Sequence, residues 1–135
     1  MKDVFTWAAK PAKRTITVGD LIKYKGQKKF TQVTANTTLE ARAAEEAGFD
    51  MIIGSASNVK EIREGSKILF LTAALALHEY QTADDVLRGA FTSLENGADA
   101  IMTPRSMEIV NMLAKEDVPV MGHLGLVPRK CTWIG

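Results

Sequence analysis

The chain has a single cysteine, Cys131, so no disulfide can form within it. That excludes the small secreted scaffolds held together by several disulfides, and it is typical of proteins in a reducing compartment. Apolar runs of the roughly 18–20 residues needed to cross a membrane are absent as well. The first residues carry no signal-peptide pattern. We therefore expect a cytoplasmic protein without a membrane segment.

An excess of either charge is also missing. The 17 basic and 16 acidic side chains nearly cancel, leaving a formal net charge of +1. This balance gives no electrostatic reason to expect binding to nucleic acid or to a membrane surface. Lys10, Lys13 and Arg14 form a small basic cluster, which we interpret as part of a solvated N-terminal arm over residues 1–14.

Residues 15–135 are long enough, and with 46% hydrophobic residues over the whole chain apolar enough, to form one domain. Short apolar runs predict strands at 30–34, 51–54, 67–71, 98–102 and 118–121. Threonine caps and glycine stops predict helices at 17–26, 37–47, 59–63, 82–96 and 106–115.

Regular alternation of strand and helix predicts an α/β fold with parallel strands and right-handed crossovers. The strands are apolar runs, as expected when both faces of a sheet are buried. Five strands are fewer than the eight of a (β/α)8 barrel, which has about 250 residues. The alternatives are a compact open sheet and the front part of a barrel. Because the chain stops at Gly135 just past a loop, we favour a partial TIM-type barrel of about five βα units.

The last predicted strand leads into a glycine-bearing segment, Gly122-His123-Leu124-Gly125. Ligands of parallel sheets collect at the carboxyl ends of the strands, so His123 is a candidate functional residue. Its alternative role is to satisfy a loop carbonyl.

Two further polar groups follow other predicted strands. Ser55, Ser57 and Asn58 are suited to hold a substrate carboxylate, or they simply turn the chain. His78 and Glu79 offer an acid–base or metal pair, or they form a solvated loop, which we favour.

Several segments together resemble ketopantoate hydroxymethyltransferases. They are residues 13–21, Thr34-Ala35, 45–54, 96–100 and, most specifically, 119–128. The resemblance implies a (β/α)8 barrel related to phosphoenolpyruvate mutase and isocitrate lyase, of which this chain would be the N-terminal part. It also implies transfer of a one-carbon hydroxymethyl group from a methylene-tetrahydrofolate donor to a 2-oxo acid, with Mg²⁺ as cofactor and an oligomeric assembly.

This sequence departs from the family where the metal should bind. The two carboxylate positions fall on Ser55 and Ala74, and the family's Lys and Glu fall on Met102 and Pro104. Since Mg²⁺ needs carboxylate oxygens, we expect no metal site and no cofactor in this chain. His123 persists as the predicted catalytic residue.

The polar residues present near the strand ends predict where substrate binds: Thr34, Ser55 and Ser57. Two hypotheses follow. The favoured one is an enzyme with altered carbon–carbon chemistry on a small 2-oxo acid. The alternative is a catalytically silent structural or regulatory relative. We also expect the open strand edges at 30–34 and 118–121 to be covered by a second copy or by a missing C-terminal half.

Overall fold

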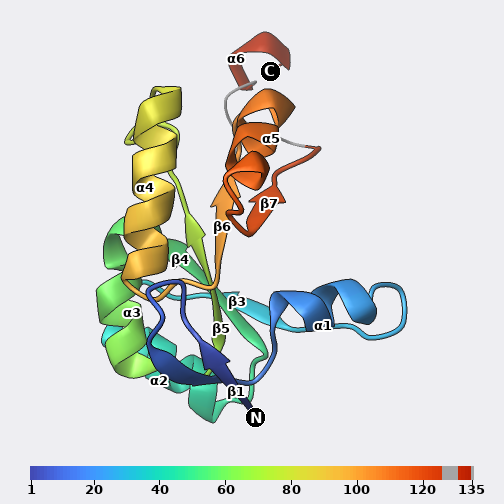
Figure 1. Cartoon of the computed structure of the whole chain (residues 1–135), viewed down its shortest axis with the longest axis vertical. Helices are drawn as coiled ribbons and strands as arrows, with labels where there is room; N and C mark the ends of the chain where they lie inside the picture. The colour runs from blue at the N-terminus through green and yellow to red at the C-terminus, as the bar shows by residue number, and fades with distance from the viewer. Residues whose placement is uncertain (126–130, 135) are drawn as a thin grey trace.

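The computed structural model describes residues 1–125 and 131–134 of the chain, and its main feature is a five-stranded parallel sheet (Figure 1). The strands lie in sequential order, as predicted. Their bounds are β3 Gln32–Thr34, β4 Met51–Ser55, β5 Phe70–Ala74, β6 Ala100–Thr103 and β7 Val120–Gly122. This sequential parallel order agrees with the predicted partial (β/α)8 barrel.

The helices alternate with these strands. They are α1 Val18–Lys23, α2 Thr38–Glu46, the 3₁₀ turn η1 Ala56–Asn58, α3 Val59–Gly65, α4 Ala83–Glu95, α5 Met107–Lys115 and α6 Cys131–Ile134. Thr17, Thr37 and Thr82 each cap a helix through a capping box, which confirms the predicted starts. None of the helices in the described residues has the length and hydrophobicity that a transmembrane segment requires.

One face of the sheet carries the main core. Helices α2, α3 and α4 lie on this side, while α1 projects from the opposite side (Figure 1). Alternate strand residues point into this core, including Ile52, Leu71 and Ile101, which are fully buried. They pack against helix residues such as Ile62 and Leu94. Helices therefore cover the outer face of the sheet, as in a barrel.

The other face corresponds to the barrel interior. Met51, Phe70 and Ala100 meet Ile16 there in a second, smaller apolar cluster. An apolar hollow of about 560 Å³ lies beside them, lined in part by α1 and β7. Within the described residues, β3 and β7 each have one unpaired edge. The interior of the barrel is therefore only half enclosed.

Four predicted strands begin two or three residues later than expected: β3 at Gln32, β5 at Phe70, β6 at Ala100 and β7 at Val120. The strand predicted at 67–71 runs from Phe70 to Ala74, and that predicted at 98–102 runs from Ala100 to Thr103. The residues before them are held by Arg63, whose guanidinium donates to the carbonyl oxygens of Leu69 at 2.7 Å and Gly97 at 2.8 Å. These side-chain contacts add to backbone hydrogen bonds at the same positions, such as that from the Asp99 N–H to the Leu71 carbonyl oxygen at 2.8 Å.

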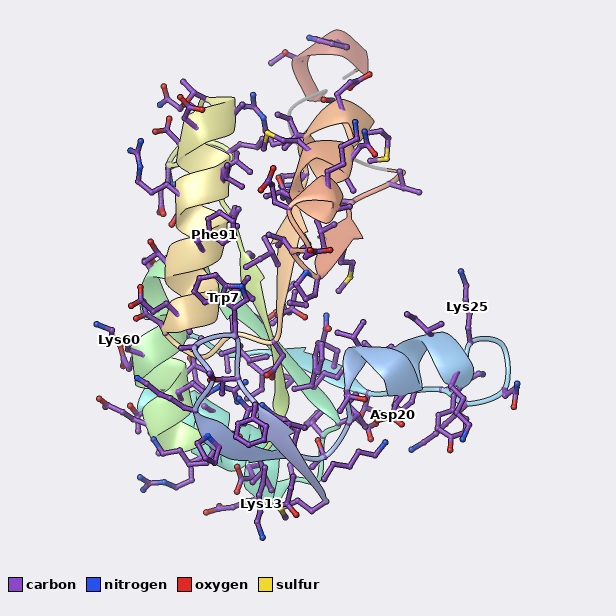
Figure 2. All side chains as sticks on the ribbon, viewed as in Figure 1. Trp7, Lys13, Asp20, Lys25, Lys60 and Phe91 are labelled. Carbon is purple, nitrogen blue, oxygen red and sulfur yellow. The ribbon has the colours of Figure 1, made fainter. Side chains whose placement is uncertain are left out.

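The N-terminal residues form an antiparallel hairpin, with β1 at Lys2–Phe5 and β2 at Pro11–Arg14. Between the strands, Trp7 points toward Phe91 of α4, and their ring centroids lie 5.5 Å apart (Figure 2). Arg14 is only 4% exposed, so its assignment to a solvated arm is wrong. The sequence could not reveal this, because the partner of Arg14 is Asp99, 85 positions away.

Candidate functional site

A cavity of about 300 Å³ opens at the carboxyl ends of strands β3 to β6. Its lining combines small, apolar and neutral polar side chains: Thr34, Asn36, Ile53, Gly54, Ser55, Ala74, Ala76 and Met102. In parallel α/β folds this end of the sheet is where ligands bind. The cavity is therefore the candidate functional site.

The register of the sheet brings the predicted residues together. Thr34 ends β3 and pairs with Ile53, and Ser55 ends β4 and pairs with Ala74. Ala74 in turn pairs with Met102. Because neighbours in register point to the same face, Ser55, Ala74 and Met102 form one row across the strand ends, and Thr34 points to the same face beside Ile53, two residues before Ser55. Two of the three predicted substrate residues, Thr34 and Ser55, line the cavity.

Ser57, the third, is exposed and does not line the cavity. Its hydroxyl lies 2.8 Å from that of Ser55 and donates to the Asn58 carboxamide oxygen at 3.4 Å. Ser57 is therefore connected to the site by the hydrogen bond between its hydroxyl and that of Ser55.

Asn36 joins two of the loops that form the site. Its Oδ1 accepts a hydrogen bond from the backbone N–H of Ser55 at 2.7 Å and lies 3.5 Å from the Nδ2 donor of Asn58. Its own backbone N–H donates to Glu40 Oε2 at 2.7 Å. This hydrogen bond is the largest cause of the lowered pKa of Glu40, which the Thr37 cap lowers further. The loop after β3 is thereby tied both to α2 and to the end of β4.

Gly54 makes the close approach of these loops possible. A Cβ atom at this position would lie 2.3 Å from the carbonyl oxygen of Ala35 and 2.4 Å from Cδ1 of Ile62. Any larger residue would push the loop after β3 away from β4. The glycine thus sets the distance between Asn36 and Ser55.

His123 lies just after β7, at the same end of the sheet as Ser55, as predicted. It is half-buried and does not line the cavity. Three strand spacings separate β4 from β7, a lateral distance on the order of 14 Å. The half-barrel brings the two residues to one rim without placing them in contact. The end of the glycine-bearing motif, residues 126–130, lies outside the described residues.

His78 and Glu79 follow β5 and form an exposed pair, with 3.5 Å between Nε2 and Oε1. Their side chains are 81% and 42% exposed, in agreement with a solvated loop. Neither lines the cavity.

The oxygen atoms that line the cavity are neutral. Among the described lining residues none is acidic, and Thr34, Asn36 and Ser55 supply hydroxyl and amide oxygens. Within the described part of the chain, no three His, Cys, Asp or Glu side chains gather closely enough to hold a metal ion. This donor set does not match the carboxylate-rich coordination of Mg²⁺.

Sequence reasoning missed Asn36 as a site residue. A signal was present, since Asn36 follows a predicted strand and precedes the Thr37 helix cap, a place where ligand-contacting side chains are common. What the sequence did not reveal is that its carboxamide turns toward β4.

Comparison with known proteins places these observations in a family. The family model described as ketopantoate hydroxymethyltransferase matches residues 54–135. Among curated relatives, the 3-methyl-2-oxobutanoate hydroxymethyltransferase of Kosmotoga olearia is 28% identical over 89% of this chain and 54% of its own length. That of Thermotoga maritima is 29% identical over 84% of this chain and 52% of its own length. The chain spans about half the length of the curated relatives it matches.

Solved structures show the same fold at low identity. 2,3-Dimethylmalate lyase, a member of the PEP mutase/isocitrate lyase superfamily, aligns with a TM-score of 0.57 at 14% identity, covering 79% of this chain and 52% of that one. A putative deoxyribose-phosphate aldolase from Toxoplasma gondii aligns with a TM-score of 0.55 at 22% identity, covering 73% and 48%. These likenesses concern the fold alone. The family model covers more than half of the sequence, and the chain therefore belongs to the ketopantoate hydroxymethyltransferase family.

Proposed function

We propose that this chain binds a small 2-oxo acid in the cavity at the strand ends and takes part in carbon–carbon chemistry related to hydroxymethyl transfer. The observation that carries the proposal is the convergence of Thr34, Asn36 and Ser55 on one cavity at the carboxyl ends of the strands. Neutral donors of this kind suit the carbonyl and carboxylate oxygens of such an acid. Ser57 supports the same site through its contact with Ser55.

We further propose that this half of the barrel works without Mg²⁺ or another cofactor of its own. Where the family's two carboxylates are expected, the cavity offers the hydroxyl of Ser55 and the methyl group of Ala74. A divalent ion would lose its hydration there without gaining anionic ligands. The chemistry is therefore altered from that of the family, because charge on the substrate must be stabilised by hydrogen bonds alone.

His123 is the proposed acid–base residue. In hydroxymethyl transfer a base removes the proton from the carbon next to the carbonyl, and the bonding electrons move onto the carbonyl oxygen to give an enolate. His123 lies on the same rim as the cavity, after β7. It serves this role only when a substrate extends across the strand ends, since His123 itself does not line the cavity.

A catalytically silent relative is the second candidate. One observation favours it: none of the described residues that line the cavity carries a titratable side chain. A silent protein would bind the acid without removing its proton.

The test uses 3-methyl-2-oxobutanoate, the acid in the name of the relatives. Binding is measured by calorimetry, and proton removal by loss of the C3 proton signal in D₂O, followed by ¹H NMR. We expect saturable binding that the Ser55→Ala variant weakens, and exchange that the His123→Gln variant slows. His78→Gln is the matched control, since His78 lies in an exposed loop away from the cavity. Binding without exchange supports the silent relative, and absence of binding contradicts both candidates.

We also propose that the chain forms a homo-oligomer through its open barrel face. Both edge strands are unpaired in the described residues, and an apolar hollow lies between them. The buried hydroxyl of Thr72, which belongs to β5, finds no hydrogen-bond partner among residues 1–125 and 131–134, as expected for an interior that is incomplete. The single cysteine supports a cytoplasmic place of action.

A further inference from the structure

We propose that Asn36 is a recognition residue of the cavity, whose Nδ2 amide donates a hydrogen bond to a carbonyl or carboxylate oxygen of the bound acid. The inference rests on the proposed function, since it names how the same cavity recognises its ligand. Asn36 is not among the substrate residues predicted from the sequence, which are Thr34, Ser55 and Ser57.

The orientation of the carboxamide follows from its neighbours. A backbone N–H can only donate, so the Asn36 atom that lies 2.7 Å from the Ser55 nitrogen must be the acceptor, Oδ1. Asn58 presents a second donor, Nδ2, to the same oxygen at 3.5 Å. With Oδ1 facing two donors, the flipped arrangement would place donor against donor. The other end of the carboxamide is therefore the NH₂ group.

This NH₂ group is available to a ligand. The hydrogen bonds that Asn36 makes with described residues use its Oδ1 and its backbone N–H, and none uses Nδ2. The residue is half-buried and lines the cavity beside Thr34 and Ser55. A donor without a partner in a confined space favours a ligand that brings an acceptor.

The backbone beneath the side chain is held from both sides. The N–H of Ala35 donates to the carbonyl oxygen of Ile53 at 3.1 Å, and the N–H of Asn36 donates to Glu40. Gly54 allows the two loops to touch. Because the donor is already positioned, little conformational entropy is lost when a ligand binds.

The chemistry of the cavity also indicates the class of ligand. Its described donors are the Asn36 amide and the hydroxyls of Thr34 and Ser55, none of which is charged. Neutral donors recognise oxygen atoms by geometry and discriminate weakly between an anion and a neutral group of the same shape. We therefore expect the cavity to accept both 3-methyl-2-oxobutanoate and its uncharged primary amide, which share the 2-oxo group.

The test is the Asn36→Asp variant of the full chain, titrated with both compounds. Aspartate keeps an acceptor for the Ser55 N–H but replaces the donor by an acceptor. We expect at least tenfold weaker binding of the acid and of the amide. The matched control is Asn58→Asp, which introduces the same charge into the same network while the Asn36 amide stays in place. It should bind the amide as the wild type does.

The outcomes separate the two proposals. If the wild type binds neither compound, the proposed function fails and this inference fails with it. If the wild type binds and Asn36→Asp binds the neutral amide equally well, the donor role of Asn36 is wrong while the proposed function stands.

A second measurement uses the wild-type protein, so its result does not depend on whether a variant folds. In wild-type protein labelled with ¹⁵N at asparagine, the Asn36 side-chain amide resonance should shift in a saturable manner as the acid is added. A resonance that stays in place while binding saturates would overturn the inference.

Discussion

Arg63 and Asp99 form a buried ion pair, with 2.6 Å between Nη2 and Oδ2. The same carboxylate accepts from Nε of Arg14 at 2.8 Å and from the backbone N–H of Leu71 at 2.9 Å. Asp99 precedes β6, so this network joins the hairpin, α3, β5 and β6 at the amino ends of the strands. In barrels that end serves stability, while the opposite end carries function. Burial lowers the pKa of Arg63 to about 10, and Asp99 opposes this, so Arg63 stays charged at neutral pH.

Replacing Asp99 should therefore be costly. In Asp99→Ala two buried guanidinium groups lose their counter-ion, and we expect a loss of about 3–5 kcal/mol in the free energy of unfolding. Urea unfolding measures it. Asp3→Ala is the control, because Asp3 is exposed and lies 3.9 Å from Lys13, and its effect should stay within about 0.5 kcal/mol. Equal effects of the two substitutions would contradict a stabilising role for the network.

Asp20 should make stability depend on acid pH. Hydrogen bonds from Lys2 and Thr17 lower the pKa of this carboxyl from 3.8 to about 2. Because the folded-state pKa is depressed, the stabilisation is complete above pH 3.8 and is lost as the pH falls toward 2. We expect Asp20→Asn to flatten this part of the stability profile, measured by thermal unfolding at a series of pH values. A profile as steep as that of the wild type would rule out Asp20 as its source.

Gly54→Ala tests the close packing beneath the cavity. The new methyl group would lie within 2.4 Å of Ala35 and Ile62 atoms, and such overpacking costs about 1–3 kcal/mol. Gly19→Ala is the matched substitution, since a Cβ atom at Gly19 would lie 3.6 Å from its nearest neighbour, Oγ1 of Thr17, and alanine favours the helix. Chemical denaturation should show opposite signs for the two variants. The loop movement in Gly54→Ala should also weaken binding of 3-methyl-2-oxobutanoate.

Metal addition tests the proposed loss of the Mg²⁺ site. Calorimetric titration of the chain with MgCl₂ should give no stoichiometric site of micromolar affinity, because the described cavity residues are not acidic. Such a site would show that carboxylates from elsewhere reach the cavity, and the metal-independent mechanism would have to be abandoned.

Assembly is tested by sedimentation equilibrium at micromolar concentration. We expect the chain to self-associate, since two unpaired strand edges and an apolar hollow favour association. Met121 is 38% exposed in the single chain, and we expect association to bury it. The Met121→Lys variant should therefore associate more weakly. A cooperative, purely monomeric species would contradict the proposed homo-oligomer.

Much of the fold was predictable because its signals are local. Thr37 and Glu40 form a capping box within four residues, and it marks the start of α2 in the sequence as in the structure. The apolar run at Met51–Ser55 marks a strand whose helix-facing side, with Ile52 and Gly54, is buried, while its other side is half-buried. Parallel order followed from the alternation of such elements. Because the strands are parallel, Thr34, Ser55 and His123, which end or follow three of them, lie at the same end of the sheet.

The sequence alone thus determined the elements, their order and the end of the sheet that carries the site, because helix caps and hydrophobic runs act over a few residues. Only the tertiary structure decided what Arg14 and Asn36 do. Arg14 is an exposed arm residue by local pattern, but Asp99 draws it into the protein. Asn36 is a turn residue by local pattern, but the N–H of Ser55 orients its carboxamide toward β4. Such contacts depend on distances between segments that are far apart in the chain, and these distances exist only once the sheet has formed.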